Sequence, residues 1–431
     1  MIKLAAKASR ALRIGKSASF LLPKPPPISP QVTAALPHTR QFSSKNSFLV
    51  VNPVAVEMIN YATALARDQK TEDSYARGLL ILEQCESAQN DDFSKGLVEL
   101  ARSTLLFERG SNEAAIERLR NIQYLSLPSI AIKVAAAEAL AGIYLECDRA
   151  DAASVAVDLT LQLLETIRLE INEGSGFKVL ETRLKAVKGL IELINGNLHS
   201  AQSFFEGVQG ESIFISNACL SFGEYLHGLR RYSTAKELYL KVLQKTSEIK
   251  DFSDPNNLGA CNMTSEEVAI AATCALGQLE AHMGNFNDAE EILTVALKKM
   301  EDRLGPNHPK VGVILTCIAL MYQLKATKER SSSLLVQEGL FRRAIELLKA
   351  PSLEVDGASE NVVSRDIIAL ARGGYAQTLC VQQTRKAEGE RLKKWAESAW
   401  RNQWMSLGEA LELAESSPKV PVIDTRICRA L

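Results

Sequence analysis

Apolar residues recur at positions i, i+3, i+4 and i+7 along most of this chain, which is the spacing of helices with one buried face. The clearest stretch is LGQLEAHMGNFNDAEEILTVALKKM, residues 276–300. Small residues in it allow two antiparallel helix backbones to approach, while an aromatic side chain wedges between them. The residues that carry the pattern are Gly277, Gly284, Phe286, Ala289, Leu293 and Ala296. This stretch therefore predicts how two helices pack and contains no chemistry.

The same order of small and aromatic residues returns along the chain, each time anchored on an alanine of the second helix. The copies that keep this anchor are those at Ala115, Ala153, Ala201, Ala235 and Ala289. Two more copies are degenerate, one with Tyr322 before Phe341 and one with Tyr375 before Trp395. A generic helical bundle has the same apolar spacing but no reason to repeat these residue types in a fixed order.

This order resembles the tetratricopeptide repeat, a helix pair of roughly 34 residues. The resemblance covers residues 72–405, although no copy has the family's first-helix tryptophan. It implies an all-α fold: a right-handed superhelix of about seven antiparallel helix pairs, an α-solenoid whose first helices line a concave groove.

Residues 296–322 resemble the kinesin-light-chain type of this repeat. Gly305 suits the end of a helix, and Pro309 suits the first turn of the next one. We therefore interpret His308 as a linker residue, because no second metal ligand lies at coordinating spacing.

The first 45 residues have the composition of an organellar transit peptide. They contain eight of the fifty Lys and Arg residues, and no Asp or Glu precedes Glu57. Lys3, Lys7 and Arg10 share one side of a predicted helix, and Arg40 followed by Gln-Phe-Ser-Ser resembles a mitochondrial processing site. We expect a mitochondrial protein, in the matrix; the alternative address is the chloroplast.

The expected domain order follows from these observations. A disordered transit peptide spans residues 1–45, a helical lead-in residues 46–71, the repeat domain residues 72–413, and an extended C-terminal tail residues 414–431. Two connections, 250–263 and 325–337, are long for this architecture. Each is either a tolerated insertion or a segment that becomes ordered when a partner binds. We favour the tolerated insertion. Thr264 with Glu267 predicts a capping box that opens the helix after the first connection.

Charge and composition exclude several classes of function. Without residues 1–45, forty-two basic residues face fifty-one acidic ones, a net charge of −9. Nucleic-acid binding needs a basic surface, so we expect no nucleic-acid partner. No uninterrupted apolar run reaches the roughly 18 residues of a membrane span. The eight cysteines are scattered without paired spacing, which predicts no disulfide framework and no metal site.

We found no catalytic motif. Gly15-Lys16-Ser17 lacks the first glycine of a phosphate-binding loop, and Gly174-Ser175-Gly176 lacks the spacing of a nucleophile elbow. We therefore predict no catalytic residue, no cofactor and no enzymatic activity.

The resemblance places the partner-binding residues on the open face of the first helices. These positions are Asn217, Glu224, His227, Gln278 and Gln323. They predict a non-catalytic scaffold or assembly factor whose groove binds a protein or peptide. The alternative is a regulatory or catalytic subunit of an organellar complex, with an active site that only the fold would assemble.

Overall fold

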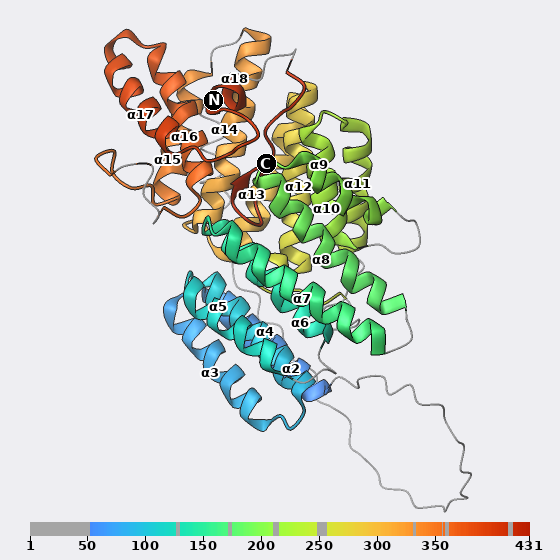
Figure 1. Ribbon diagram of the computed structural model, residues 1–431. Helices are drawn as coiled ribbons and strands as arrows, with labels where there is room; N and C mark the ends of the chain where they lie inside the picture. The colour runs from blue at the N-terminus through green and yellow to red at the C-terminus, as the bar shows by residue number, and fades with distance from the viewer. Residues whose placement is uncertain are drawn as a thin grey trace, which may run out of the picture. The chain divides into compact units, whose positions relative to one another are not determined.

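The computed structural model describes residues 52–125, 130–170, 175–209, 215–247, 257–330, 333–355, 357, 362–412 and 417–431. Contacts divide the chain into Met1–Phe48, which lies outside the described residues, and a second unit, Leu49–Leu431. The expected transit peptide therefore stays a prediction. The second unit is built from consecutive helix pairs (Figure 1).

Each pair has a first and a second helix that pack antiparallel to each other. The first helices are α2 (Pro53–Gln69), α4 (Asp92–Glu108), α6 (Ile130–Glu146), α8 (Ser175–Ile194), α10 (Ser216–Gly228), α12 (Ser265–Met283), α14 (Pro309–Glu329) and α16 (Arg365–Cys380). The second helices are α3 (Glu72–Ala88), α5 (Asn112–Asn121), α7 (Ala150–Glu170), α9 (Leu198–Phe205), α11 (Tyr232–Thr246), α13 (Phe286–Leu304), α15 (Leu334–Leu347) and α17 (Lys386–Ala399).

The described residues thus form eight pairs, and the predicted all-α repeat fold is confirmed. The additional pair is α2 with α3: the stretch expected as a helical lead-in supplies the first helix of a full unit. Beyond the pairs lie a short helix, α18 (Leu407–Glu412), and two very short antiparallel strands, β1 (Ile423–Asp424) and β2 (Arg429–Ala430).

Local signals begin and end the helices where the sequence indicates. Thr264 caps α12 by accepting a hydrogen bond from the Glu267 amide, although the Glu267 side chain turns away to pair with cations. Gly305 ends α13 at a φ of 91°. His308 is the N-cap of α14, with its Nδ1 accepting from the Lys310 amide, and Pro309 occupies the first turn. His308 is thus a linker residue that also caps a helix.

The small residues of the repeat are where two helices approach most closely. All five anchor alanines are fully buried. Gly223 on α10 faces the ring of Tyr239, and Gly277 on α12 faces Leu293 of α13. A β-carbon at either glycine would lie 2.8 Å or less from those side chains. The small-residue positions are therefore set by packing, as the repeat pattern indicates.

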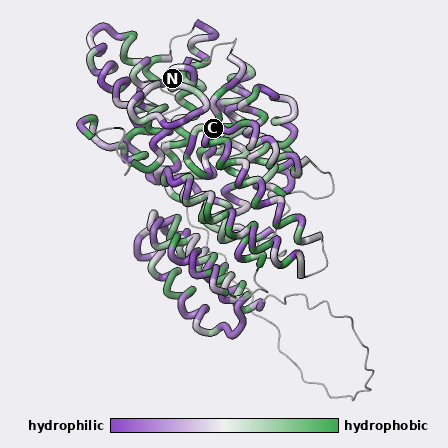
Figure 2. Tube along the Cα trace, in the orientation of Figure 1, coloured by the Kyte–Doolittle hydropathy of each residue, from purple (hydrophilic) through white to green (hydrophobic). Residues whose placement is uncertain are grey.

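Helix α14 is long and apolar enough to cross a membrane by length and composition, yet 61% of its most apolar window is buried inside the array. It packs against α12 and α13 on one side and α15 and α16 on the other. Hydrophobic and hydrophilic residues intermingle along the helices (Figure 2). The apolar character of α14 is thus accounted for by contacts within the fold.

We predict opposite effects of alanine at two helical glycines. Gly277→Ala should lower the free energy of unfolding by about 1–3 kcal/mol, because its β-carbon overlaps Leu293. Gly339→Ala on α15 should raise it by up to about 1 kcal/mol, because nothing lies within 4 Å of that β-carbon and alanine favours the helix. Urea unfolding of both variants tests this; equal effects would contradict the packing described.

Candidate functional site: a groove filled by its own chain

Two segments of the same chain cover the face of the first helices where the repeat resemblance predicts a groove, and we keep the name groove for this face. We call residues 257–263 the connecting segment and residues 417–431 the C-terminal segment. The C-terminal segment is buried from Val420 to Leu431. Figure 1 shows it in red between the helices α10 and α12 on one side and α14 and α16 on the other. From the sequence we expected an extended tail, and the structure instead places residues 420–431 inside the fold.

The C-terminal segment folds as a small hairpin. Val422 and Leu431 exchange two main-chain hydrogen bonds of 3.0 and 2.8 Å, next to the pairing of Ile423 with Ala430. A two-stranded hairpin of this size has little stability of its own in water. Its conformation therefore depends on the groove that surrounds it.

Gln278, on α12, forms hydrogen bonds with the main chain of the hairpin. Its side-chain amide donates to the Ile423 carbonyl over 2.9 Å and accepts from the Ile423 amide over 2.8 Å. The Gln278 side chain thus satisfies both the main-chain amide and the main-chain carbonyl of Ile423, as a neighbouring β-strand would. It requires no particular side chain at position 423, so Gln278 recognises extended backbone as such.

Arg426 is the central side chain of the hairpin and is 1% exposed. Its guanidinium donates to Asn217 Oδ1 over 2.8 Å, to Ser221 Oγ over 3.1 Å, and to Glu224 Oε2 over 2.7 Å. These three residues are spaced four and three apart, so they share one face of α10. Within the hairpin, Asp424 Oδ2 also accepts from Arg426 over 2.8 Å.

Two carboxyl groups thus share one buried guanidinium. Burial and the nearby Asp424 raise the pKa of Glu224 well above its ordinary value of 4.5, against the opposing effect of Arg426. Glu224 Oε1 has no hydrogen-bond partner among the described residues. Two carboxyl groups are therefore buried side by side, and Arg426 supplies the positive charge that compensates them.

Arg429 occupies a second acidic pocket. Its Nε donates to Asp366 on α16 over 2.7 Å, and its Nη1 to Asp148 at the end of α6 over 2.6 Å. Nη1 also contacts the Leu145 carbonyl oxygen at 3.3 Å. The hairpin thereby connects α6 to α16, which are far apart in sequence.

The connecting segment covers the other end of the groove. The Cys261 amide donates to Thr104 Oγ1 of α4 over 2.9 Å, and Arg183 of α8 donates to the Leu258 carbonyl. Asn262 lies against Gly142 of α6, where any β-carbon would overlap it. The long 250–263 connection is thus largely buried in the fold from Leu258 to Met263.

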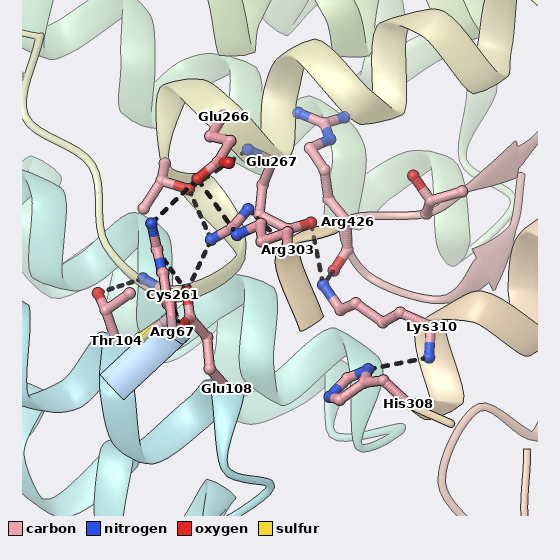
Figure 3. A network of polar contacts seen from close by, with 12 residues as sticks. Arg67, Thr104, Glu108, Cys261, Glu266, Glu267, Arg303, His308, Lys310 and Arg426 are labelled. Carbon is pink, nitrogen blue, oxygen red and sulfur yellow. Dashed lines mark hydrogen bonds and ion pairs between the residues drawn. The ribbon is translucent and has the colours of Figure 1, made fainter. Parts of the chain in front are cut away.

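A network of charged residues joins the two ends of the groove (Figure 3). Arg303 pairs with Glu108 at 2.9 Å and with Glu267 at 2.9 Å, and Glu267 pairs with Lys310 at 3.2 Å. Lys310 also donates to the Arg426 carbonyl over 3.2 Å, which connects the network to the hairpin. Burial alone would raise the pKa of Glu108, but the nearby Arg303 and Arg67 hold this pKa below its ordinary value.

Three of the five predicted partner-binding residues contact the C-terminal segment: Asn217, Glu224 and Gln278. His227 instead lies inside the helix array, 2.8 Å from His282 and 3.2 Å from the Tyr239 hydroxyl. Burial lowers its pKa well below the ordinary value of 6.5. That these positions bind a partner remains a prediction.

Gln323 donates to Gln377, and both line a cavity of about 200 Å³ that Gln278 and Ile423 also border. Gln323 thus lies near the hairpin without a hydrogen bond to it in the structure. Its predicted role in partner binding is likewise untested.

The residues that sequence reasoning missed are those outside the repeat positions: Asp148, Asp366, Lys310, Arg426 and Arg429. Two signals pointed toward them. The C-terminal segment contains Val420, Val422, Ile423, Ile427 and Leu431, which is too apolar for a solvated tail. Helix α6, IAIKVAAAEALAGIYLE, is apolar on all faces and is buried throughout from Ala131 to Glu146, so its groove side had to be covered.

The chain has no match among protein-family profiles. It has none among curated proteins. Among solved structures it is similar to the crystal structure of yeast Tom70, with 12% sequence identity and a TM-score of 0.26, over 81% of this chain and 92% of that chain. A TM-score this low does not define a shared shape, so the fold assignment depends on the helix pairs themselves. Among the described residues, no group of three or more His, Cys, Asp or Glu side chains is placed to hold a metal ion.

We predict a pH-dependent stability from Glu146, which borders a cavity of about 880 Å³ beside Lys310 and Cys428. Burial raises its pKa from 4.5 to about 7. A carboxyl with a raised pKa in the folded state contributes stability at low pH, and this contribution is lost as the pH rises through about 7. Glu146 should therefore lower the free energy of unfolding of the native chain by roughly 2–3 kcal/mol between pH 5 and pH 8. In Glu146→Gln this part of the decrease should be absent.

Urea unfolding at both pH values measures this difference. Glu291→Gln, at an exposed position of α13, is the matched control and should leave the pH dependence unchanged. If Glu146→Gln behaves like this control, Glu146 is not buried as described.

Proposed function

We propose that this chain is a non-catalytic, protein-binding scaffold or assembly factor in mitochondria. The observation that carries the proposal is the pairing of Gln278 with the main chain of Ile423. A groove that satisfies both polar groups of a backbone residue is built to bind polypeptide. Around that contact, polar side chains of α10 and α16 supply the selectivity.

The groove's chemistry favours a peptide over a small metabolite. Its polar groups are distributed along the hairpin, on α6, α10, α12, α14 and α16, rather than converging on one point. An enzyme site concentrates its polar groups around one reacting centre. A distributed set of contacts suits a ligand that is itself a chain.

The mitochondrial address is proposed from residues 1–45 alone. We predict that these residues, fused to a fluorescent protein, direct it to mitochondria. A second fusion with Lys3, Lys7 and Arg10 changed to Gln should stay outside, because the basic side of the predicted helix is lost. Fluorescence microscopy with a mitochondrial marker tests this. Accumulation of the first fusion in chloroplasts, or equal behaviour of the two, would contradict the proposal.

We predict that the full chain, joined to a proximity-labelling enzyme, enriches one defined protein or complex inside the organelle. The control is the same enzyme joined to residues 1–45 only, which shares the address and lacks the groove. Gln278→Ala should lower the enrichment at least about fivefold, whereas Lys298→Ala, at an exposed position of α13, should not. If the full chain labels only what the control labels, the scaffold proposal is wrong.

A further inference from the structure

The C-terminal hairpin differs from an ordinary core element in what it buries. Asp424, Arg426 and Arg429 are each 5% exposed or less. Replacing a buried ion pair with apolar residues is often neutral or stabilising, whereas removing one partner is strongly destabilising. Buried charges of this kind therefore contribute little net stability and much selectivity for the correct partner.

The two arginine pockets have a defined chemistry and a defined spacing. The first consists of Asn217, Ser221 and Glu224, which surround the planar guanidinium from one face of α10. A lysine cannot satisfy acceptors spread around a fork in this way. The pocket therefore discriminates arginine from other cations as well as from neutral residues.

The second pocket, formed by Asp148, Asp366 and the Leu145 carbonyl, binds the arginine three residues later. Its acceptors come from α6, from the turn after α6 and from α16, so the position of the arginine is fixed from two sides. Asp148 also pairs with Arg365 at 3.3 Å, whereas Asp366 has Arg429 as its cation. Together the two pockets bind two arginines three residues apart, the pattern Arg-x-x-Arg, on a hairpin whose main chain is bound by Gln278.

The groove does not satisfy every polar atom of this arrangement. Glu224 Oε1 and Thr425 Oγ1 are buried and have no hydrogen-bond partner among the described residues. A buried polar atom without a partner costs free energy. Glu224 Oε1 belongs to the groove, whereas Thr425 Oγ1 belongs to the hairpin itself. A segment that keeps the two arginines, donates a hydrogen bond to Glu224 Oε1 and has no unpaired polar atom in place of Thr425 would bind more tightly than the chain's own hairpin.

We propose that the groove is a recognition site for an Arg-x-x-Arg segment of a partner protein, and that the chain's own residues 417–431 occupy it as an intramolecular competitor. This inference depends on the proposed protein-binding function and names the ligand of that groove. The charge complementarity of the two pockets is the argument for a partner of this chemistry. The partner must displace the hairpin, so binding is limited to partners that outcompete it.

The test uses the full chain with a protease site placed between residues 412 and 417 and cut after folding. A fluorescent peptide with the sequence of residues 417–431 is added, and its binding is followed by fluorescence anisotropy. We expect exchange of the peptide into the cut chain and none into the uncut chain, where the covalently linked hairpin competes. Circular dichroism verifies that the cut chain stays folded.

Variants of this peptide test whether the groove requires the two arginines. Peptides with Arg426→Ala or Arg429→Ala should bind at least about 100-fold more weakly, since the first leaves the buried Glu224 without its cation and the second leaves the buried Asp366 without its cation. A peptide with Lys419→Ala loses the same charge and a hydrogen bond to the Trp404 carbonyl, but its carboxylate neighbour Glu409 is exposed, so no buried carboxyl is left unpaired. It should bind within about tenfold of the native peptide. Equal losses for Arg426→Ala and Lys419→Ala would overturn the proposal.

A pair of compensating substitutions, one in the peptide and one in the cut chain, tests whether Arg426 is bound through a specific pairing with Glu224 or only by packing. The Arg426→Gln peptide should bind at least about tenfold better to a cut chain carrying Glu224→Gln than to the native cut chain, because a neutral pair replaces an unpaired carboxyl. Additive losses would show that no specific pairing exists. No exchange into a cut chain that remains folded would show that the hairpin is a permanent part of the core, which also overturns the proposal.

Two further outcomes are decisive. Exchange of labelled hairpins between uncut chains, with dimers that grow with concentration, would identify a second copy as the occupant and overturn the proposal of a different partner. If organellar labelling finds a defined partner but the peptide variants bind alike, the scaffold function stands and this inference fails. If the arginine selectivity holds but no partner is found, the scaffold function fails, and with it the claim that a partner protein occupies the groove; only the selectivity of the groove for its own hairpin stands.

Discussion

The requirement to cover the groove side of the first helices governs the rest of this structure. Helix α6 is buried from Ala131 to Glu146, and α12, α14 and α16 are buried over most of their length. Helices that are apolar on all faces cannot leave one face in water. The connecting segment and the C-terminal hairpin meet this requirement from within the chain. An α-solenoid that would otherwise present an open groove thus has a filled one.

Filling the groove from the same chain has electrostatic consequences. The hairpin brings two arginines into a region that already contains Glu224, Asp148 and Asp366, and the pairs form where water is excluded. The network around Arg303 extends this arrangement to Lys310, whose amine holds the main chain of the hairpin. The groove is therefore polar in its contacts with the hairpin, although the helices that form it are largely apolar.

Much of the fold could be predicted because its signal is local. The anchor alanines and the small residues facing rings, such as Gly223 against Tyr239, recur at fixed spacing within each helix pair. The positions Asn217, Glu224 and Gln278 follow from the same register, since residues spaced three or four apart share a helix face. His227 shows the limit of that argument: its position in the repeat points to the groove, yet Tyr239 and His282 hold it inside the array.

The sequence by itself determined the all-α repeat fold, most of the helix pairs and some of the signals that begin and end helices, because each of these depends on residues a few positions apart. Only the tertiary structure decided what fills the groove. Arg426 meets Glu224 across 202 residues and Arg429 meets Asp148 across 281. Contacts of that separation leave no periodic trace in the sequence, since they form only when the helix pairs have stacked and created the pockets that receive the two arginines.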